Sequence, residues 1–229
     1  MGALLGTRRP RFRPLAALLC AAAPTVADAE ASPVSEDPDA DGSRAPLVLF
    51  LGDSLTAGFG LGEESAFPAR VGAALADEGI DVSIVNAGVS GDTSAGGLAR
   101  LGWLLRLEPA LVVVGLGAND GLRGLDLRTT ESNLREIVAE ARGAGGEVLL
   151  LGMRMPPNYG TYGEEFAAMY TRLAEELDVA LVPFLLEGVG GDPELNLPDG
   201  IHPNEEGQRR VAENVLPALR ALLEALPSE

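Results

Sequence analysis

The amino-acid sequence predicts an α/β fold, a three-layer α/β/α sandwich in which helices cover both faces of a five-stranded parallel sheet. Two observations support this fold class. From residue 46 onward, short runs rich in Val, Ile and Leu alternate with longer segments of helical character. The short runs are almost continuously apolar, as is typical of parallel strands that helices bury on both faces. No internal repeat is visible in the 229 residues, so we expect one domain of this kind.

The expected strands are the short apolar runs, over residues 46–52, 81–88, 110–117, 147–153 and 178–184. The expected helices are the longer segments between them, over residues 66–78, 94–106, 130–142 and 163–177, with a last helix over 204–223. Because a helix separates each pair of successive strands, we expect the strands to run parallel through right-handed crossovers.

The first 29 residues have the pattern of a secretory signal peptide. Four arginines precede an apolar run over residues 15–23, which is too short to span a bilayer. Ala27-Asp28-Ala29 then has the small-x-small form of a cleavage site. We therefore expect cleavage after residue 29 and a secreted or periplasmic protein with no stable membrane insertion. The alternative is a lipoprotein anchored through Cys20, although Leu19 is larger than the residue that usually precedes such a cysteine.

Residues 30–45 are acidic, contain proline and have almost no large apolar side chain. Such a segment cannot offset the entropy of ordering, so we expect a disordered linker followed by one folded domain over residues 46–226. Asp37, Asp39, Asp41 and Gly42 imitate the start of a calcium loop, but position twelve of that loop is Val48 instead of the required Glu. No calcium site is expected here.

The composition excludes several classes of function. All 17 basic residues are arginine, so no lysine is present to bind nucleotide phosphates or to form a Schiff base. One cysteine and one histidine do not suffice for an intrachain disulfide or a typical zinc site. A net charge of −17 disfavours nucleic-acid binding. The spacing of Gly58, Gly60 and Gly62 is not that of a dinucleotide loop. We expect no metal and no cofactor.

Polar residues gather where the expected strands end, which is where ligands bind in parallel sheets. Four short blocks are involved, Gly52-Asp53-Ser54-Leu55, Val89-Ser90-Gly91-Asp92, Gly117-Ala118-Asn119-Asp120 and Asp199-Gly200-Ile201-His202. These blocks, in this order, resemble the GDSL family of the SGNH hydrolases, and the resemblance extends over essentially all of residues 46–225. Residues 86–101 and 153–160 are similar to its compact secreted bacterial branch, which has thioesterase I, lysophospholipase and arylesterase activities. The resemblance implies a flavodoxin-like fold.

The chemistry of the residues agrees with a serine hydrolase. A serine hydroxyl needs an adjacent base, and the only imidazole in the chain is that of His202. Asp199, three positions earlier, is spaced to accept a hydrogen bond from the imidazole and orient it. The simpler alternatives are that Ser54 caps a turn and that Asp199 belongs to a Pro-Asp-Gly turn. We expect Ser54, His202 and Asp199 to form a catalytic triad.

Acyl transfer also requires donors for the oxyanion. The backbone N–H groups of Ser54 and Gly91 and the side-chain amide of Asn119 are candidates, and the resemblance implies that Gly91 and Asn119 form the oxyanion hole. Without that resemblance, both residues would be interpreted as ordinary loop and turn formers. Asp53, Asp92 and Asp120 are expected to shape the loops by capping and hydrogen bonding.

The sequence therefore predicts an esterase that cleaves carboxylic esters or thioesters of small molecules, such as aryl esters, acyl thioesters or lysophospholipids, through an acyl-serine. The loop over residues 153–162 is rich in apolar side chains, and we expect Met153, Met155, Pro156 and Tyr159, or Tyr162, to wall an acyl pocket. Packing of this loop onto the core is the alternative. A carbohydrate O-acetyl esterase and a catalytically silent secreted binding module are the other functional hypotheses. We expect a monomer.

Overall fold

The computed structural model describes residues 45–227. The predicted signal peptide, Cys20, the calcium-like stretch and residues 30–44 of the predicted linker lie outside the described residues, so these interpretations stay predictions. Within the described part of the chain, no helix combines the length and the apolar character that a membrane span requires.

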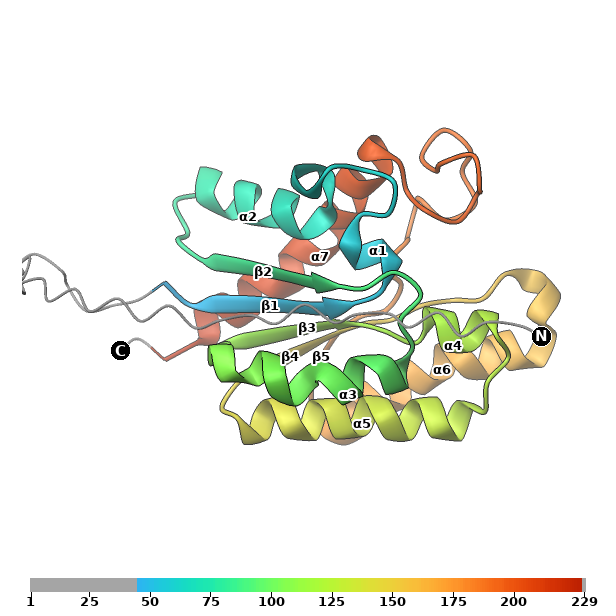
Figure 1. The fold of residues 1–229 in the computed structure, drawn as a ribbon, viewed down its shortest axis with the longest axis horizontal. Coiled ribbons are helices and arrows are strands. Elements are labelled where there is room, and N and C mark those ends of the chain that lie inside the picture. The colour runs from blue at the N-terminus through green and yellow to red at the C-terminus, as the bar shows by residue number, and fades with distance from the viewer. Residues whose placement is uncertain (1–44, 228–229) are drawn as a thin grey trace, which may run out of the picture. The chain divides into compact units, whose positions relative to one another are not determined.

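The strands form one sheet with the order β2-β1-β3-β4-β5, in which all neighbours run parallel (Figure 1). Their bounds are Leu47–Gly52 for β1, Ser83–Gly88 for β2, Leu111–Gly115 for β3, Glu147–Leu151 for β4 and Ala180–Val182 for β5. The five-stranded parallel sheet is therefore confirmed. The predicted carboxyl ends of β1 and β2 were right, whereas the predictions for β3, β4 and β5 each extended two residues too far. β3 ends early because Gly117 takes the left-handed conformation, with φ of 106°, and β5 ends before Pro183, which has no N–H for a ladder.

Five longer helices correspond to the predicted ones, namely α2 (Phe67–Asp77), α3 (Ser94–Leu104), α5 (Leu127–Gly143), α6 (Gly160–Leu177) and α7 (Glu205–Ala225). The sequence analysis missed two short helices, α1 (Ser54–Ala57) and α4 (Ala118–Leu122), and three 3₁₀ turns at Glu63–Ser65, Leu105–Leu107 and Pro157–Tyr159. These elements are too short to show a helical period in the sequence. Both short helices directly follow strands, so they lie at the carboxyl edge of the sheet.

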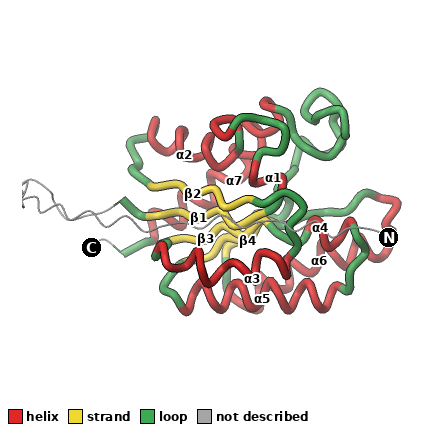
Figure 2. The backbone as a smooth tube through the Cα atoms, in the orientation of Figure 1, coloured by secondary structure: helices red, strands yellow, loops and turns green. Residues whose placement is uncertain are grey.

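The helices form two layers around the sheet. α2 and α7 pack together on one face, and α3, α5 and α6 cover the other (Figures 1 and 2). The central strands are buried almost completely: Val48, Leu49, Phe50 and Leu51 of β1 and Leu111, Val112 and Val113 of β3 have no exposed surface. This burial accounts for the continuous apolar runs in the sequence.

Three glycines form a row across the carboxyl ends of the three strands nearest to α1. Gly52 of β1 is in register with Gly88 of β2 on one side and with Gly115 of β3 on the other. A Cβ atom on Gly52 would lie 1.9 Å from Oγ1 of Thr56, and one on Gly88 would lie 2.3 Å from the backbone nitrogen of Ala57. The side chain of Thr56 therefore packs against Gly52 and the backbone of α1 packs against Gly88, so a side chain at either position would displace α1.

We predict that Gly88→Ala destabilises the protein. All three nearest atoms are backbone atoms of Thr56 and Ala57, so no side-chain rotation relieves the overlap. Overpacking of this kind costs about 1–3 kcal/mol, which lowers the midpoint of thermal unfolding by at least about 2 °C for a domain of this size. Thermal unfolding followed by circular dichroism measures the shift.

Gly102→Ala is the matched control for this prediction. Gly102 lies in α3, and a Cβ atom there meets nothing within 4 Å. The substitution should raise stability by about 0.5–1 kcal/mol, since alanine is the better helix former. Equal midpoints for the two variants would show that α1 does not depend on the glycine row.

Candidate active site

Ser54 is the first residue of α1, directly beyond the carboxyl end of β1. Asp53 caps the helix, because its Oδ1 atom accepts a hydrogen bond from the backbone N–H of Leu55 at 3.0 Å. The chain thus changes from strand to helix within two residues. The half-buried side chain of Ser54 borders a cavity at this edge of the sheet.

His202 and Asp199 lie in the loop that precedes α7. Oδ1 of Asp199 accepts hydrogen bonds from the backbone N–H groups of Ile201 and His202, at 2.9 and 3.0 Å. The N–H of Leu197 donates to the carbonyl of His202 at 2.7 Å and closes the loop from the other side. These bonds within the loop fix the position of the imidazole without help from a strand.

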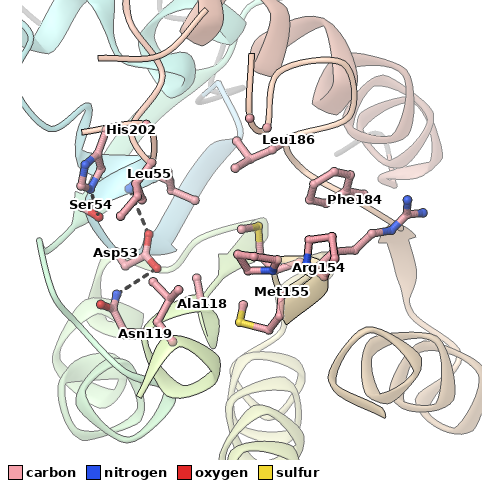
Figure 3. A pocket seen from close by; sticks show the side chains of 18 residues that line it. Asp53, Ser54, Leu55, Ala118, Asn119, Arg154, Met155, Phe184, Leu186 and His202 are labelled. Carbon is pink, nitrogen blue, oxygen red and sulfur yellow. Dashed lines mark hydrogen bonds between the residues drawn. The ribbon is translucent and has the colours of Figure 1, made fainter. Parts of the chain in front are cut away.

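The three side chains form a continuous hydrogen-bonded chain. Nδ1 of His202 lies 2.7 Å from Oδ2 of Asp199, and Nε2 lies 2.9 Å from Oγ of Ser54 (Figure 3). The pKa of Asp199 is lowered to about 2 by hydrogen bonds, of which the one from the backbone N–H of His202 contributes most. The Asp199 carboxylate is therefore ionised and accepts hydrogen bonds at neutral pH. Nδ1 must then carry the proton of a neutral imidazole, and the Nε2 lone pair faces the serine.

Phe59 adds an aromatic surface to the imidazole. The two rings lie 4.3 Å apart between centroids, with an interplanar angle of 32°, and Phe59 remains 46% exposed. The sequence analysis did not identify this contact. An apolar residue five positions after Ser54, on a glycine-rich turn, was the only available signal.

Of the two residues expected in the oxyanion hole, Asn119 lines the cavity and Gly91 does not. Asn119 lies in the first turn of α4 and lines the same cavity as Ser54, and its Nδ2 atom donates to Oδ2 of Asp53 at 3.2 Å. Gly91 lies in an exposed turn, closed by the bond from the Asp92 N–H to the Val89 carbonyl at 3.0 Å. Gly91 is not among the residues that line the cavity, and its φ of 81° requires glycine.

Two arginines hold this turn, and the sequence analysis missed both. Arg100 of α3 binds Oδ2 of Asp92 through Nε at 2.8 Å and the carbonyl of Gly52 through Nη2 at 3.0 Å. Arg123 donates to the carbonyl of Gly91 at 2.9 Å. Arg100 thereby connects the turn to the residue that precedes Asp53 and Ser54.

Asp120, the remaining acidic residue of the predicted blocks, is hydrogen-bonded within the protein. Asp120 is buried and accepts hydrogen bonds from the backbone N–H and the hydroxyl of Ser94, at 2.8 and 2.5 Å, which joins α4 to the start of α3. Among residues 45–227, no group of three or more His, Cys, Asp or Glu side chains is arranged to hold a metal ion.

The cavity beside Ser54 has a volume of about 580 Å³. Met153, Met155 and Pro156 line it, together with Phe184 and Leu186 from the segment after β5 (Figure 3). Tyr159, which we expected in the wall, is not among the lining residues; its hydroxyl instead donates to the carbonyl of Leu122 at 3.1 Å. Tyr162 likewise donates to the carbonyl of Leu125, at 2.9 Å.

The sequence analysis also overlooked the contribution of the segment after β5. Its apolar residues at 184–186, next to the glycines at 188, 190 and 191, were the signal for a wall at this edge. The cavity is therefore a mainly apolar space with Ser54, His202 and Asn119 at one end and methionine, proline and phenylalanine side chains along its length.

Comparison with known proteins shows the family of the chain. The chain is 50% identical over 183 residues to esterase TesA of Pseudomonas aeruginosa, which covers 79% of this chain and 91% of that protein. It is 44% identical over 183 residues to the thioesterase 1/protease 1/lysophospholipase L1 of Escherichia coli, covering 79% and 86%. A crystal structure of TesA matches with a TM-score of 0.75 and 49% identity, over 77% of this chain and 99% of that one. Residues 50–210 match the model of the GDSL-like lipase/acylhydrolase family, and the chain belongs to that family.

Proposed function

We propose that this protein is a serine hydrolase that cleaves carboxylic esters and thioesters and binds the acyl chain in the cavity beside Ser54. The observation that carries the proposal is the hydrogen-bonded chain from Asp199 through His202 to Ser54, which ends at the mouth of an apolar cavity. The names of the relatives, an esterase and a thioesterase and lysophospholipase, agree with this chemistry.

In the proposed mechanism, Oγ of Ser54 attacks the carbonyl carbon of the substrate while Nε2 of His202 takes its proton. The tetrahedral intermediate collapses when His202 gives this proton to the leaving alcohol or thiol, and an acyl-serine remains. A water molecule then attacks the acyl carbon, with His202 again accepting the proton, and the carboxylic acid leaves as Ser54 recovers its hydrogen. Asp199 keeps the imidazole in the tautomer that this sequence requires.

The negative charge that develops on the carbonyl oxygen needs fixed donors. We assign this role to the backbone N–H groups of Ser54 and Gly91 and to the side-chain amide of Asn119. The position of Asn119 beside Ser54 in the cavity supports its part in the assignment. Arg100 and Arg123 hold the turn that contains Gly91, and this supports the assignment of the Gly91 N–H, since an oxyanion donor must not move during the reaction.

The apolar cavity favours substrates with an extended acyl chain over acetylated sugars. Met153, Met155 and Leu186 offer hydrocarbon and thioether surface, and each buried methylene contributes up to about 0.8 kcal/mol. We further propose that residues 1–29 direct export to the periplasm or the medium and that the mature enzyme acts as a monomer on small ester or thioester molecules.

We predict that Ser54→Ala abolishes hydrolysis of an aryl ester, because the attacking group is lost. The variant should unfold at the wild-type temperature, and a fluorophosphonate probe that labels the wild type should no longer label it. Mass spectrometry of the intact protein measures the labelling. Esterase activity above a trace in a correctly folded variant would disprove the role of Ser54.

We predict that Asn119→Ala lowers kcat by about 10²- to 10³-fold, the usual effect of removing one oxyanion donor. KM should change little, since the ground-state carbonyl interacts weakly with such donors. Steady-state kinetics with an aryl ester measures both constants. A rise in KM with kcat unchanged would show that Asn119 only shapes the cavity.

We predict that Met155→Ala shifts the preferred acyl length. Met155 is half-buried in the cavity wall, and shortening it opens room for additional carbons. Rates for a series of aryl esters from acetyl to long-chain acyl should show an optimum at longer chains. The rate for the acetyl ester, which has no further acyl carbons, should change little and serves as the internal control. An unchanged length profile would place the acyl chain elsewhere.

A further inference from the structure

Asp53 is a buried carboxylate next to Ser54 that has no part in the mechanism given above. Only 1% of its surface is exposed, and it borders the cavity between Ser54 and Asn119 (Figure 3). We propose that Asp53 is a positioning residue that orients the side-chain amide of Asn119 toward the reacting carbonyl. The proposal deepens the proposed function and rests on it, because it requires Asn119 to be an oxyanion donor.

The two oxygens of Asp53 have different partners. Oδ1 accepts from the backbone N–H of Leu55 at 3.0 Å, and Oδ2 accepts from Nδ2 of Asn119 at 3.2 Å (Figure 3). Capping of α1 explains only the first bond, and serine caps a helix about as well as aspartate without burying a charge. Burying a carboxylate is costly, so capping alone does not explain why an aspartate, with a charge and a second oxygen, stands at this position.

Orientation of the amide supplies that reason. The side chain of asparagine has an oxygen and a nitrogen at nearly equivalent positions, and a half-turn of the amide exchanges them. An ionised carboxylate only accepts hydrogen bonds, so Asp53 selects the rotamer with Nδ2 toward itself. Nδ2 has a second hydrogen, which is then available to the oxyanion. The reversed amide would present its carbonyl oxygen instead and repel the developing charge.

The protonation state of Asp53 determines whether this selection works. Burial raises the pKa of Asp53 to about 6, against the opposing hydrogen bonds from Leu55 and Asn119. The titratable groups that face it are His202, which lowers this pKa, and Asp92, which raises it and is itself paired with Arg100. As the pH rises through this pKa, Asp53 becomes ionised and only accepts hydrogen bonds. As the pH falls through it, the carboxyl becomes protonated and can donate to Oδ1 of Asn119, which stabilises the reversed amide.

A double-mutant cycle between Asp53 and Asn119 tests the proposal. Asp53→Ser keeps a side-chain oxygen to cap α1 and removes the partner of Asn119. We expect Asp53→Ser to lower kcat by roughly 10- to 100-fold, as loss of an orienting partner does in metal sites, with KM nearly unchanged. In the Asn119→Ala background, the same substitution should change kcat by less than about 2-fold. Equal effects in both backgrounds would overturn the proposal.

The pH dependence of kcat/KM gives a second test, because it would not change if Asp53 had only a structural role. The acid limb of kcat/KM in the wild type should depend on two protonations, one of them that of Asp53. In Asp53→Ser it should depend on one. If this variant does not fold, Asp53→Asn, which has nearly the same shape, tests the same loss of a protonation. A wild-type limb with a single protonation would contradict the proposal.

Asp126→Ser is the matched control. Asp126 caps α5 by accepting from the backbone N–H of Arg128 at 3.0 Å, and it is not among the residues that line the cavity. This substitution should leave kcat and the pH profile unchanged. An inactive wild type would refute the proposed function itself, whereas an active wild type with a normal Asp53→Ser variant would refute only the role of Asp53.

Discussion

The close approach of α1 to the sheet is the constraint on which the site depends. Gly52, Gly88 and Gly115 stand in register at the ends of three neighbouring strands. The side chain of Thr56 lies where a Cβ atom on Gly52 would be, and the backbone of Thr56 and Ala57 lies where a Cβ atom on Gly88 would be. Ser54 is therefore placed by the close packing of α1 against the ends of these strands, which leaves it little freedom to shift. The same approach brings Asp53 within reach of Asn119, and it brings the carbonyl of Gly52 within reach of Arg100.

The partner of Ser54 is positioned by different means. His202 is 148 residues away along the chain and lies in a loop that is held by its own hydrogen bonds, through Asp199 and Leu197. The site thus joins a serine fixed by packing to a histidine fixed by polar contacts. Carboxylates act in the same way on both sides of the serine: Asp199 selects one tautomer of an imidazole, and in our proposal Asp53 selects one rotamer of an amide.

The sequence predicted the sheet and the proximity of Ser54, His202 and Asp199 because each left a strong local signal. Buried parallel strands are continuous apolar runs, and a chain with one histidine leaves one choice of base for Ser54. The contacts that depend on the path of the chain in space left no such signal. Arg100 looks like any exposed helix residue until the fold brings Asp92 and Gly52 to it, and α1 and α4 are shorter than the period that identifies a helix. Tyr159 was misplaced because an aromatic residue in a loop indicates burial, but not which surface it covers.

Because His202 is the single histidine of the chain, the site is accessible to spectroscopy. Because the chain has one histidine, every imidazole signal in a nuclear magnetic resonance spectrum of the protein comes from the side chain between Asp199 and Ser54. Nitrogen chemical shifts differ between a protonated and an unprotonated ring nitrogen, so one isotope-labelled sample reports the tautomer without any resonance assignment. The resting state of the site and its change on acylation of Ser54 are then directly observable in solution.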